Sequence, residues 1–212
     1  MQETYRKDMS HLTWEQVYAR QMQRASLAGE WMDALRLKAG DIVLDVGSGP
    51  GFVSFLLAER VGPSGLVYAV DPSAEALAYL QRLQNERGAS NVKTIVADAA
   101  ALDLPGVRAD AALISMVLHH TDDPAAILRN VARLLKAGGR SVIAEFDPDG
   151  PCDHGPPRQE RLTAREIRSW CDAAGFSTLE VRQQSPEHYM IVLERPDESA
   201  RTRIANEAVN RP

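Results

Sequence analysis

Residues 42–51 read Ile-Val-Leu-Asp-Val-Gly-Ser-Gly-Pro-Gly, a short apolar run with β-branched side chains that ends in a cluster of glycines. Such a run is typical of a buried strand, and the glycines let the backbone turn tightly directly after it. Helical periodicity then begins at residue 52 and continues to residue 61. A strand, a glycine-rich turn and a helix in this order indicate the first unit of an α/β sheet.

The same alternation continues along the chain. Four more apolar runs are predicted to be strands and two more stretches to be helices: strands at 66–70, 92–96, 111–118 and 140–146, and helices at 74–87 and 124–136. Ser73 is a fitting N-cap and Pro124 fits the first turn of a helix, while Gly138 and Gly139 are predicted to end the helix at 124–136. Buried strands that alternate with helices predict a parallel sheet.

The two ends of the chain depart from this alternation. Thr163 and Glu166 predict a capping box that opens a helix reaching about Ala174. Two strands, at 177–182 and 188–194, are joined by so short a link that they form an antiparallel hairpin. Near the N-terminus, residues 13–37 predict one or two amphipathic helices, broken near Gly29.

We therefore predict a single Rossmann-like, doubly wound α/β sheet, mostly parallel, with an antiparallel C-terminal hairpin strand. Residues 1–36 are expected to form an N-terminal helical cap, residues 37–195 the sheet domain, and residues 196–212 a polar tail that is loosely helical or disordered.

Composition and charge narrow the class of protein. The net charge is −5 and no basic stripe is visible, which argues against a nucleic-acid partner. The two cysteines, Cys152 and Cys171, form neither a disulfide framework nor a zinc cluster, and they fit free thiols in a reducing cytoplasm. No signal peptide and no membrane span are recognised. We expect a soluble cytoplasmic protein with a small-molecule substrate, and leave a homodimer open.

Three consecutive predicted strands carry an aspartate at or near their ends: Asp45, Asp71 and Asp98. The carboxyl ends of parallel strands meet at one edge of the sheet, where open α/β sheets bind ligands. Asp71 is placed to accept hydrogen bonds from ribose hydroxyls, and Asp98 from the amino group of adenine. The glycine turn opens a helix whose positive dipole end suits an anionic group. The pattern predicts a nucleoside ligand.

Two alternatives remain open. A nicotinamide-dependent oxidoreductase would carry G-x-G-x-x-G, and here Gly47 and Gly49 match while Phe52 occupies the third position. Such an enzyme also gives no reason for Asp98. The second alternative is a binding protein that has kept the ligand site without the chemistry.

Together these motifs resemble class I methyltransferases that depend on S-adenosyl-L-methionine (SAM), of the small-molecule kind related to the quinone-biosynthesis enzymes. The resemblance covers roughly residues 37–195. It is carried by VLDVGSGPG (43–51), VYAVDPS (67–73), VADAAALDLP (96–105), DAALISMVLHHTDDP (110–124) and LLKAGGRSVIAEF (134–146).

The resemblance implies SAM as the cofactor and assigns a role to each part of the motifs. Asp45 would hold the amino end of SAM, Asp71 its ribose hydroxyls, and Asp98 its adenine amino group. Other positions would line the cofactor: Gly47, Ser48, Gly49 and Gly51 along the methionine part, Pro72 against the adenine face, the Ala99 N–H at the ring, and Ser115 or Met116 near the methionine amine. Pro72 stands where the family often has a larger aliphatic residue, which weakens the stacking assignment.

Methyl transfer from a sulfonium is an in-line displacement, and a base is needed only if the acceptor must lose a proton. The candidate catalytic residues are His120, His154 and Asp147. If His119 and His120 both lie on the fourth strand, they point in different directions and at most one faces the site. His120, Asp147 and His154 are also metal-ligand types, but their spacing is not diagnostic and we predict no metal.

Overall fold

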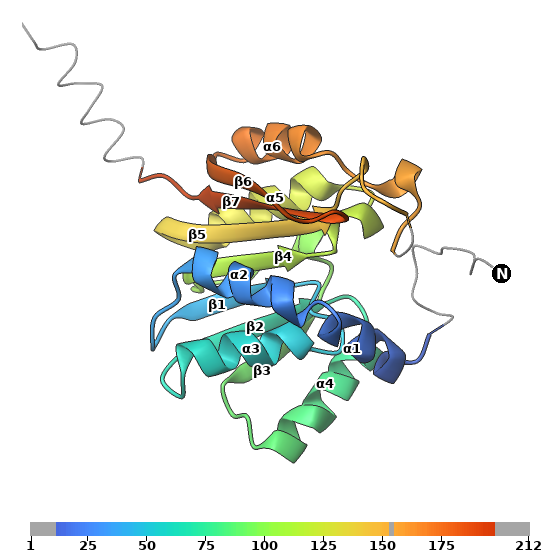
Figure 1. The fold of residues 1–212 in the computed structure, drawn as a ribbon. Helices are drawn as coiled ribbons and strands as arrows, with labels where there is room; N and C mark the ends of the chain where they lie inside the picture. Colours follow the sequence, from blue (N-terminus) through green and yellow to red (C-terminus); the bar gives the residue numbers. More distant parts are fainter. Residues whose placement is uncertain (1–11, 153–154, 198–212) are drawn as a thin grey trace, which may run out of the picture.

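The computed structural model describes residues 12–152 and 155–197, and they form one seven-stranded sheet with helices on both faces (Figure 1). The strands lie in the order β3-β2-β1-β4-β5-β7-β6. Their bounds are β1 Ile42–Val46, β2 Leu66–Asp71, β3 Val92–Val96, β4 Ala109–Ser115, β5 Leu135–Phe146, β6 Ser177–Ser185 and β7 His188–Glu194. Strands β1 to β5 pair in parallel, whereas β7 runs antiparallel to both β5 and β6. The predicted fold class and C-terminal hairpin are confirmed.

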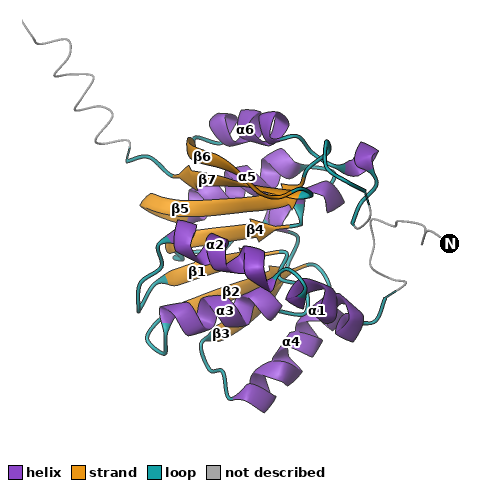
Figure 2. Cartoon of the chain, in the orientation of Figure 1, coloured by secondary structure: helices purple, strands orange, loops and turns teal. Residues whose placement is uncertain are grey.

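Helices α2 and α3 lie in front of the sheet in the view of Figure 2, and α5 lies behind it. The helices are α1 Trp14–Met22, α2 Ala25–Leu35, α3 Phe52–Val61, α4 Ala74–Arg87, α5 Pro124–Leu134 and α6 Ala164–Ala173, with 3-10 turns η1 Ala99–Ala101, η2 Leu118–His120 and η3 Arg158–Glu160. None of the helices in the described ranges is long and apolar enough to cross a membrane.

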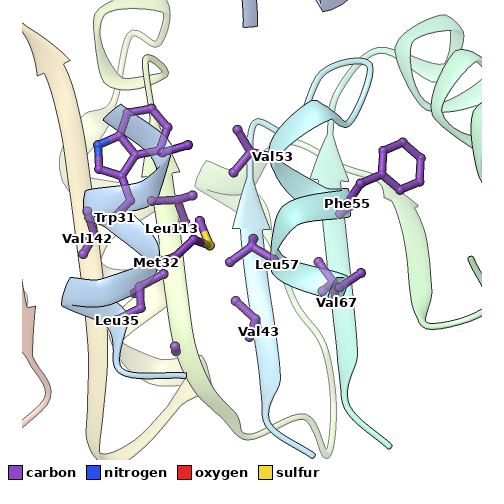
Figure 3. Close-up of a cluster of buried hydrophobic side chains, with 14 of the residues drawn as sticks. Trp31, Met32, Leu35, Val43, Val53, Phe55, Leu57, Val67, Leu113 and Val142 are labelled. Atoms are coloured by element: carbon purple, nitrogen blue, oxygen red, sulfur yellow. The ribbon is translucent and has the colours of Figure 1, made fainter. Parts of the chain in front are cut away.

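Alternate residues of each inner strand point to opposite faces and so divide the core into two clusters. Val43 and Leu113 join the cluster under α2 and α3, whereas Leu44 and Ile114 join the cluster under α5 and α6. Figure 3 shows the first cluster, in which Trp31 and its neighbours on α2 pack against the sheet beside Leu57 of α3 and its neighbours. Burial on both faces is what makes these strands continuously apolar.

The predicted helix signals are found where expected. The Ser73 hydroxyl accepts from the Ala76 N–H and caps α4, and Asp123 caps α5 with Pro124 in its first turn. Thr163 and Glu166 form the capping box of α6. These side chains satisfy N–H groups that have no partner inside the helix.

The predicted helix break near Gly29 is wrong. The chain breaks at Gln23 and Arg24, between α1 and α2, and Gly29 lies on the exposed face of α2. A glycine inside a helix costs about 1 kcal/mol relative to alanine. Burial of the apolar face of α2, led by Trp31, offsets that cost.

The predicted end of the third central helix is also wrong. Helix α5 ends at Leu134, and the next residue already belongs to β5. Leu135 is fully buried and pairs with Ala109 of β4, so the strand begins as soon as the apolar face of the helix is complete. Gly138 and Gly139 lie within β5, where their backbones exchange hydrogen bonds with Arg195.

The fourth strand is shorter than predicted. It ends at Ser115, after which Met116 adopts a left-handed backbone with φ 57° and η2 follows. His119 and His120 therefore lie on a 3-10 turn and not on a strand. Their rings lie side by side, with centroids 4.1 Å apart and planes tilted by 40°, so the divergence expected of two neighbours on a strand does not apply.

Candidate active site

The glycine-rich turn at residues 47–51 joins β1 to α3 at the carboxyl edge of the sheet. The N–H groups of Gly47 and Ser48 both donate to the Val70 carbonyl, which ties the turn to β2. Gly47 and Gly51 have φ values of 69° and 90°, which glycine adopts without strain. A methyl group on Gly51 would lie 2.4 Å from Leu80 side-chain atoms, so the turn leaves no room for a larger residue there.

Asp71 ends β2 and connects the glycine-rich turn to the start of α4. One carboxylate oxygen accepts from the Gly49 N–H at 2.8 Å, and the other accepts from the Ser73 N–H at 2.9 Å. Burial raises the pKa of this carboxyl, and the two backbone hydrogen bonds oppose that effect. The sequence predicted the position of Asp71, but not that its carboxylate helps to build the turn.

Asp45 lies at the end of β1 and is buried. Its carboxylate accepts a hydrogen bond from the Ser54 hydroxyl at 2.6 Å. Burial raises its pKa to about 7; the Ser54 hydrogen bond opposes the shift, and the charge of Asp71 adds to it. The group therefore changes its charge near neutral pH, which is unusual for an aspartate.

The Ser48 hydroxyl is an orphaned polar group inside this loop. It is buried, and none of the described residues offers it a hydrogen-bond partner. A buried hydroxyl without a partner costs free energy, so a partner supplied by a ligand is favoured. The turn therefore fits a ligand that carries polar groups.

The residues expected at the adenine and methionine ends also lie along this edge. Asp98 is exposed and caps η1 by accepting from the Ala100 N–H at 2.8 Å, and Ala99 is buried behind it. Pro72 is exposed between Asp71 and α4. Ser115 ends β4, and the N–H of the next residue, Met116, donates to the Ala144 carbonyl. A left-handed backbone at a residue other than glycine, as at Met116, is uncommon and clusters at functional sites.

Gln21 of α1 contacts the glycine-rich turn, a contact that the sequence did not reveal. Its amide donates to the Ser48 carbonyl at 3.1 Å and accepts from the Phe52 N–H at 3.1 Å. Helix α3 has no side-chain cap of its own, and Gln21 satisfies the first of its N–H groups. The N-terminal helix is thereby attached to the turn.

His119 and Glu145 form a buried pair that the sequence indicated only in part. The Glu145 carboxylate accepts from the Leu118 N–H at 2.7 Å and lies 2.6 Å from His119 Nδ1. Burial alone would raise the pKa of Glu145, but the charge and hydrogen bond of His119 hold it below its usual value. The lone acid in the apolar run VIAEF was the sequence signal for this pair. The pair fixes η2 and so places the half-buried His120.

Asp147 and His154 belong to the loop that follows β5. The Asp147 carboxylate accepts from the Gln183 amide and the Asp149 N–H, both within the loop and hairpin region. His154 lies outside the described residues. Within the ranges 12–152 and 155–197, no three histidine, cysteine, aspartate or glutamate side chains are grouped to hold a metal.

The chain is similar in sequence to known methyltransferases. A ubiquinone/menaquinone biosynthesis C-methyltransferase of Xanthomonas oryzae is 38% identical over 112 residues, which are 52% of this chain and 44% of the relative. An arsenite methyltransferase of Halobacterium salinarum is 27% identical over 156 residues, covering 67% of this chain and 39% of the relative. The chain spans less than half the length of either relative.

Solved structures agree on the fold. A SAM-dependent methyltransferase from Aquifex aeolicus superposes with a TM-score of 0.74 and 26% identity, and the match covers 79% of this chain and 89% of that protein. The family model of a methyltransferase domain matches residues 37–208. The chain belongs to this methyltransferase domain family.

Proposed function

We propose that this protein transfers the methyl group of SAM to a small-molecule acceptor. The observation that carries the proposal is the arrangement around Asp71, whose carboxylate stands between the glycine-rich turn and α4 at the carboxyl edge of the sheet. Membership of the methyltransferase family and the similarity to a SAM-dependent enzyme support the same cofactor.

The proposed cofactor contacts follow the edge of the sheet. Asp71 would bind the ribose hydroxyls, and the exposed carboxylate of Asp98 would accept from the adenine amino group. Asp45 and the orphaned Ser48 hydroxyl would bind polar groups of the methionine part of SAM. The other proposed contacts are Gly47, Gly49 and Gly51 in the turn, Pro72 and Ala99 beside adenine, and Ser115 and Met116 beside the amine.

Bound SAM would supply an electrophilic methyl group on a positively charged sulfur. The acceptor atom would form a bond to that methyl carbon while the carbon–sulfur bond broke, and S-adenosylhomocysteine would leave. His120 is our proposed base for an acceptor that must lose a proton, because it is half-buried at the edge and its turn is fixed by the pair of His119 and Glu145. Asp147 is better suited to anchoring its loop, and His154 stays a candidate.

One relative is named an arsenite methyltransferase, but the two cysteines of this chain argue against an arsenic acceptor. Cys171 is buried, and burial raises the pKa of its thiol to about 12, so it is not a ready metal or metalloid ligand. Cys152 is exposed on the loop after β5, far along the chain from Cys171. We propose an organic acceptor in the cytoplasm, with no nucleic-acid partner, and leave a homodimer open.

Calorimetric titration of the protein with SAM and S-adenosylhomocysteine, with NADH as the control, tests the cofactor. Micromolar binding of the first two without binding of NADH is expected. Binding of NADH alone would favour an oxidoreductase. A screen of organic acceptors with radiolabelled SAM then separates an enzyme from a binding protein, since a binding protein would bind SAM and transfer nothing.

His120→Ala tests the base once an acceptor is known. General acid–base catalysis contributes roughly 10²- to 10⁴-fold, so kcat should fall by that range while the affinity for S-adenosylhomocysteine stays within about twofold. His154→Ala is measured in parallel. An equal loss of cofactor affinity in His120→Ala would move His120 from the chemistry to cofactor binding.

A further inference from the structure

Phe146, the last residue of β5, lies at the carboxyl edge with two arginines against its ring. The guanidinium carbon of Arg24 is 5.2 Å from the ring centroid, and that of Arg161 is 5.1 Å from it. Phe146 is only 2% exposed, so both cations are held at a desolvated ring. Cation–π contacts of this kind gain strength where water is excluded.

The two arginines differ in their hydrogen bonds. Arg161 donates to the carbonyls of Asp147, Pro151 and Pro156, and it thereby organises the loop after β5. Arg24 is half-buried, at the break between α1 and α2. Yet across residues 12–152 and 155–197 no oxygen accepts a hydrogen bond from its guanidinium.

Two acidic groups lie near Arg24, but neither accepts a hydrogen bond from its guanidinium. Burial lowers the pKa of Arg24 and nearby Arg20 adds to this, while Glu145 and Glu187 oppose it from a distance. The carboxylate of Glu145 is already bonded to the η2 backbone and His119. Glu145 and Phe146 are consecutive strand residues, so their side chains leave β5 on opposite faces.

An arginine carries five N–H donors in a planar fork, which matches a carboxylate or phosphate. The fork is half-buried beside a desolvated ring, where a charge-assisted hydrogen bond to an anion is stronger than in open water. Arg24 also lies three residues after Gln21, which contacts Ser48 and Phe52 of the cofactor turn. The guanidinium therefore lies at the end of β5, and its backbone follows directly on the helix that contacts the cofactor turn.

We infer that Arg24 binds an anionic group, a carboxylate or a phosphate, of the methyl acceptor, with the Phe146 ring against the guanidinium. This rests on the proposed function, and it narrows the acceptor to one that carries a negative charge a short way from the atom to be methylated.

The test uses matched probes that differ only in charge. The full-length protein is titrated calorimetrically with benzoate, phenyl phosphate and the neutral benzamide, with and without S-adenosylhomocysteine. At least one anion should bind roughly tenfold or more tightly than benzamide, as expected of a charge-assisted hydrogen bond. Arg24→Met should remove that preference, and Arg24→Lys should reduce it, because lysine keeps the charge but not the fork. Arg60→Met, at a half-exposed arginine of α3, is the control that should retain it.

Equal binding of the anions and benzamide by the unaltered protein would overturn the inference. So would an anion preference that survives in Arg24→Met. Sulfate should raise the Tm of the unaltered protein more than that of Arg24→Met, because a ligand stabilises the state that binds it; identical shifts would mean that Arg24 only holds Phe146. Absence of S-adenosylhomocysteine binding would overturn the proposed function instead, since the titrations without it still test Arg24.

Discussion

The two halves of the carboxyl edge are built in different ways. The proposed cofactor half comprises the turn at 47–51 with Asp71 and Asp98, and each of its parts lies at or just after the end of a strand. The proposed acceptor half comprises Arg24, residues 117–120, Glu145 with Phe146, and Arg161, which come from separate parts of the chain. In the cofactor half the site residues are positioned by the strand ends on which they lie. In the acceptor half they are brought together from distant parts of the chain by tertiary packing. Substitutions in the first half should change ligand binding, and those in the second should change stability or acceptor preference.

The largest loss of stability is expected for substitutions of Glu145. Glu145→Ala leaves His119 and two backbone N–H groups without their buried acceptor, and breaking a buried pair costs about 3–5 kcal/mol of unfolding free energy. Glu145→Gln keeps an acceptor oxygen and should lose less. Urea denaturation measures both. Arg133→Ala breaks the exposed pair with Asp103 and should cost below about 1 kcal/mol, so similar losses in the two pairs would erase the proposed contrast.

At Asp71 we expect the main loss to be in cofactor affinity and not in stability. Asp71→Ala removes two proposed hydrogen bonds from the ribose to a charged acceptor, and the affinity for S-adenosylhomocysteine should fall by roughly 10²- to 10³-fold. Asp103→Ala, at an exposed carboxylate paired with Arg133, is the matched control and should bind normally. Unchanged affinity in Asp71→Ala would remove the central contact of the proposed cofactor site.

The same contrast explains what the sequence could predict. The parallel strands, the hairpin and the aspartate positions follow from periodicity and spacing, which are local; the order of the strands in the sheet was not predicted. The length of β4 was not predictable, because the apolar run through Leu118 is continued by a buried 3-10 turn and apolar periodicity does not distinguish the two. Nor was the contact of Arg24 with Phe146, since nothing in residues 20–30 signals the partner from β5.

Asp45 should make cofactor binding depend on pH. With a pKa near 7, the carboxyl is about one-tenth ionised at pH 6 and nine-tenths ionised at pH 8, so affinity for the cationic amino end should rise roughly tenfold over this range. Because the pKa is raised in the folded state, the stability that Asp45 contributes is complete below about pH 4 and is lost as pH rises through 7.

Asp45→Asn separates this group from other titrating residues. The variant should bind S-adenosylhomocysteine with a flatter pH profile between pH 6 and pH 8, measured by calorimetry. Its unfolding free energy should also fall less than that of the unaltered protein between pH 4 and pH 7. Matching profiles for the two proteins would place the titrating group elsewhere.

Gln21 lies on the helix that joins the two halves, and its substitution should cause the smallest loss of cofactor affinity. Its amide holds α1 to the turn through hydrogen bonds to Ser48 and Phe52, each worth about 1 kcal/mol or less in net terms. Gln21→Ala should therefore weaken S-adenosylhomocysteine binding about threefold, with Gln23→Ala, at an exposed residue after α1, as the control. If Gln21→Ala instead weakened benzoate binding alone, α1 would act by carrying Arg24 and not by supporting the turn. Loss of both affinities together would mean that α1 positions cofactor and acceptor as one unit, and the two halves would then be coupled through this amide.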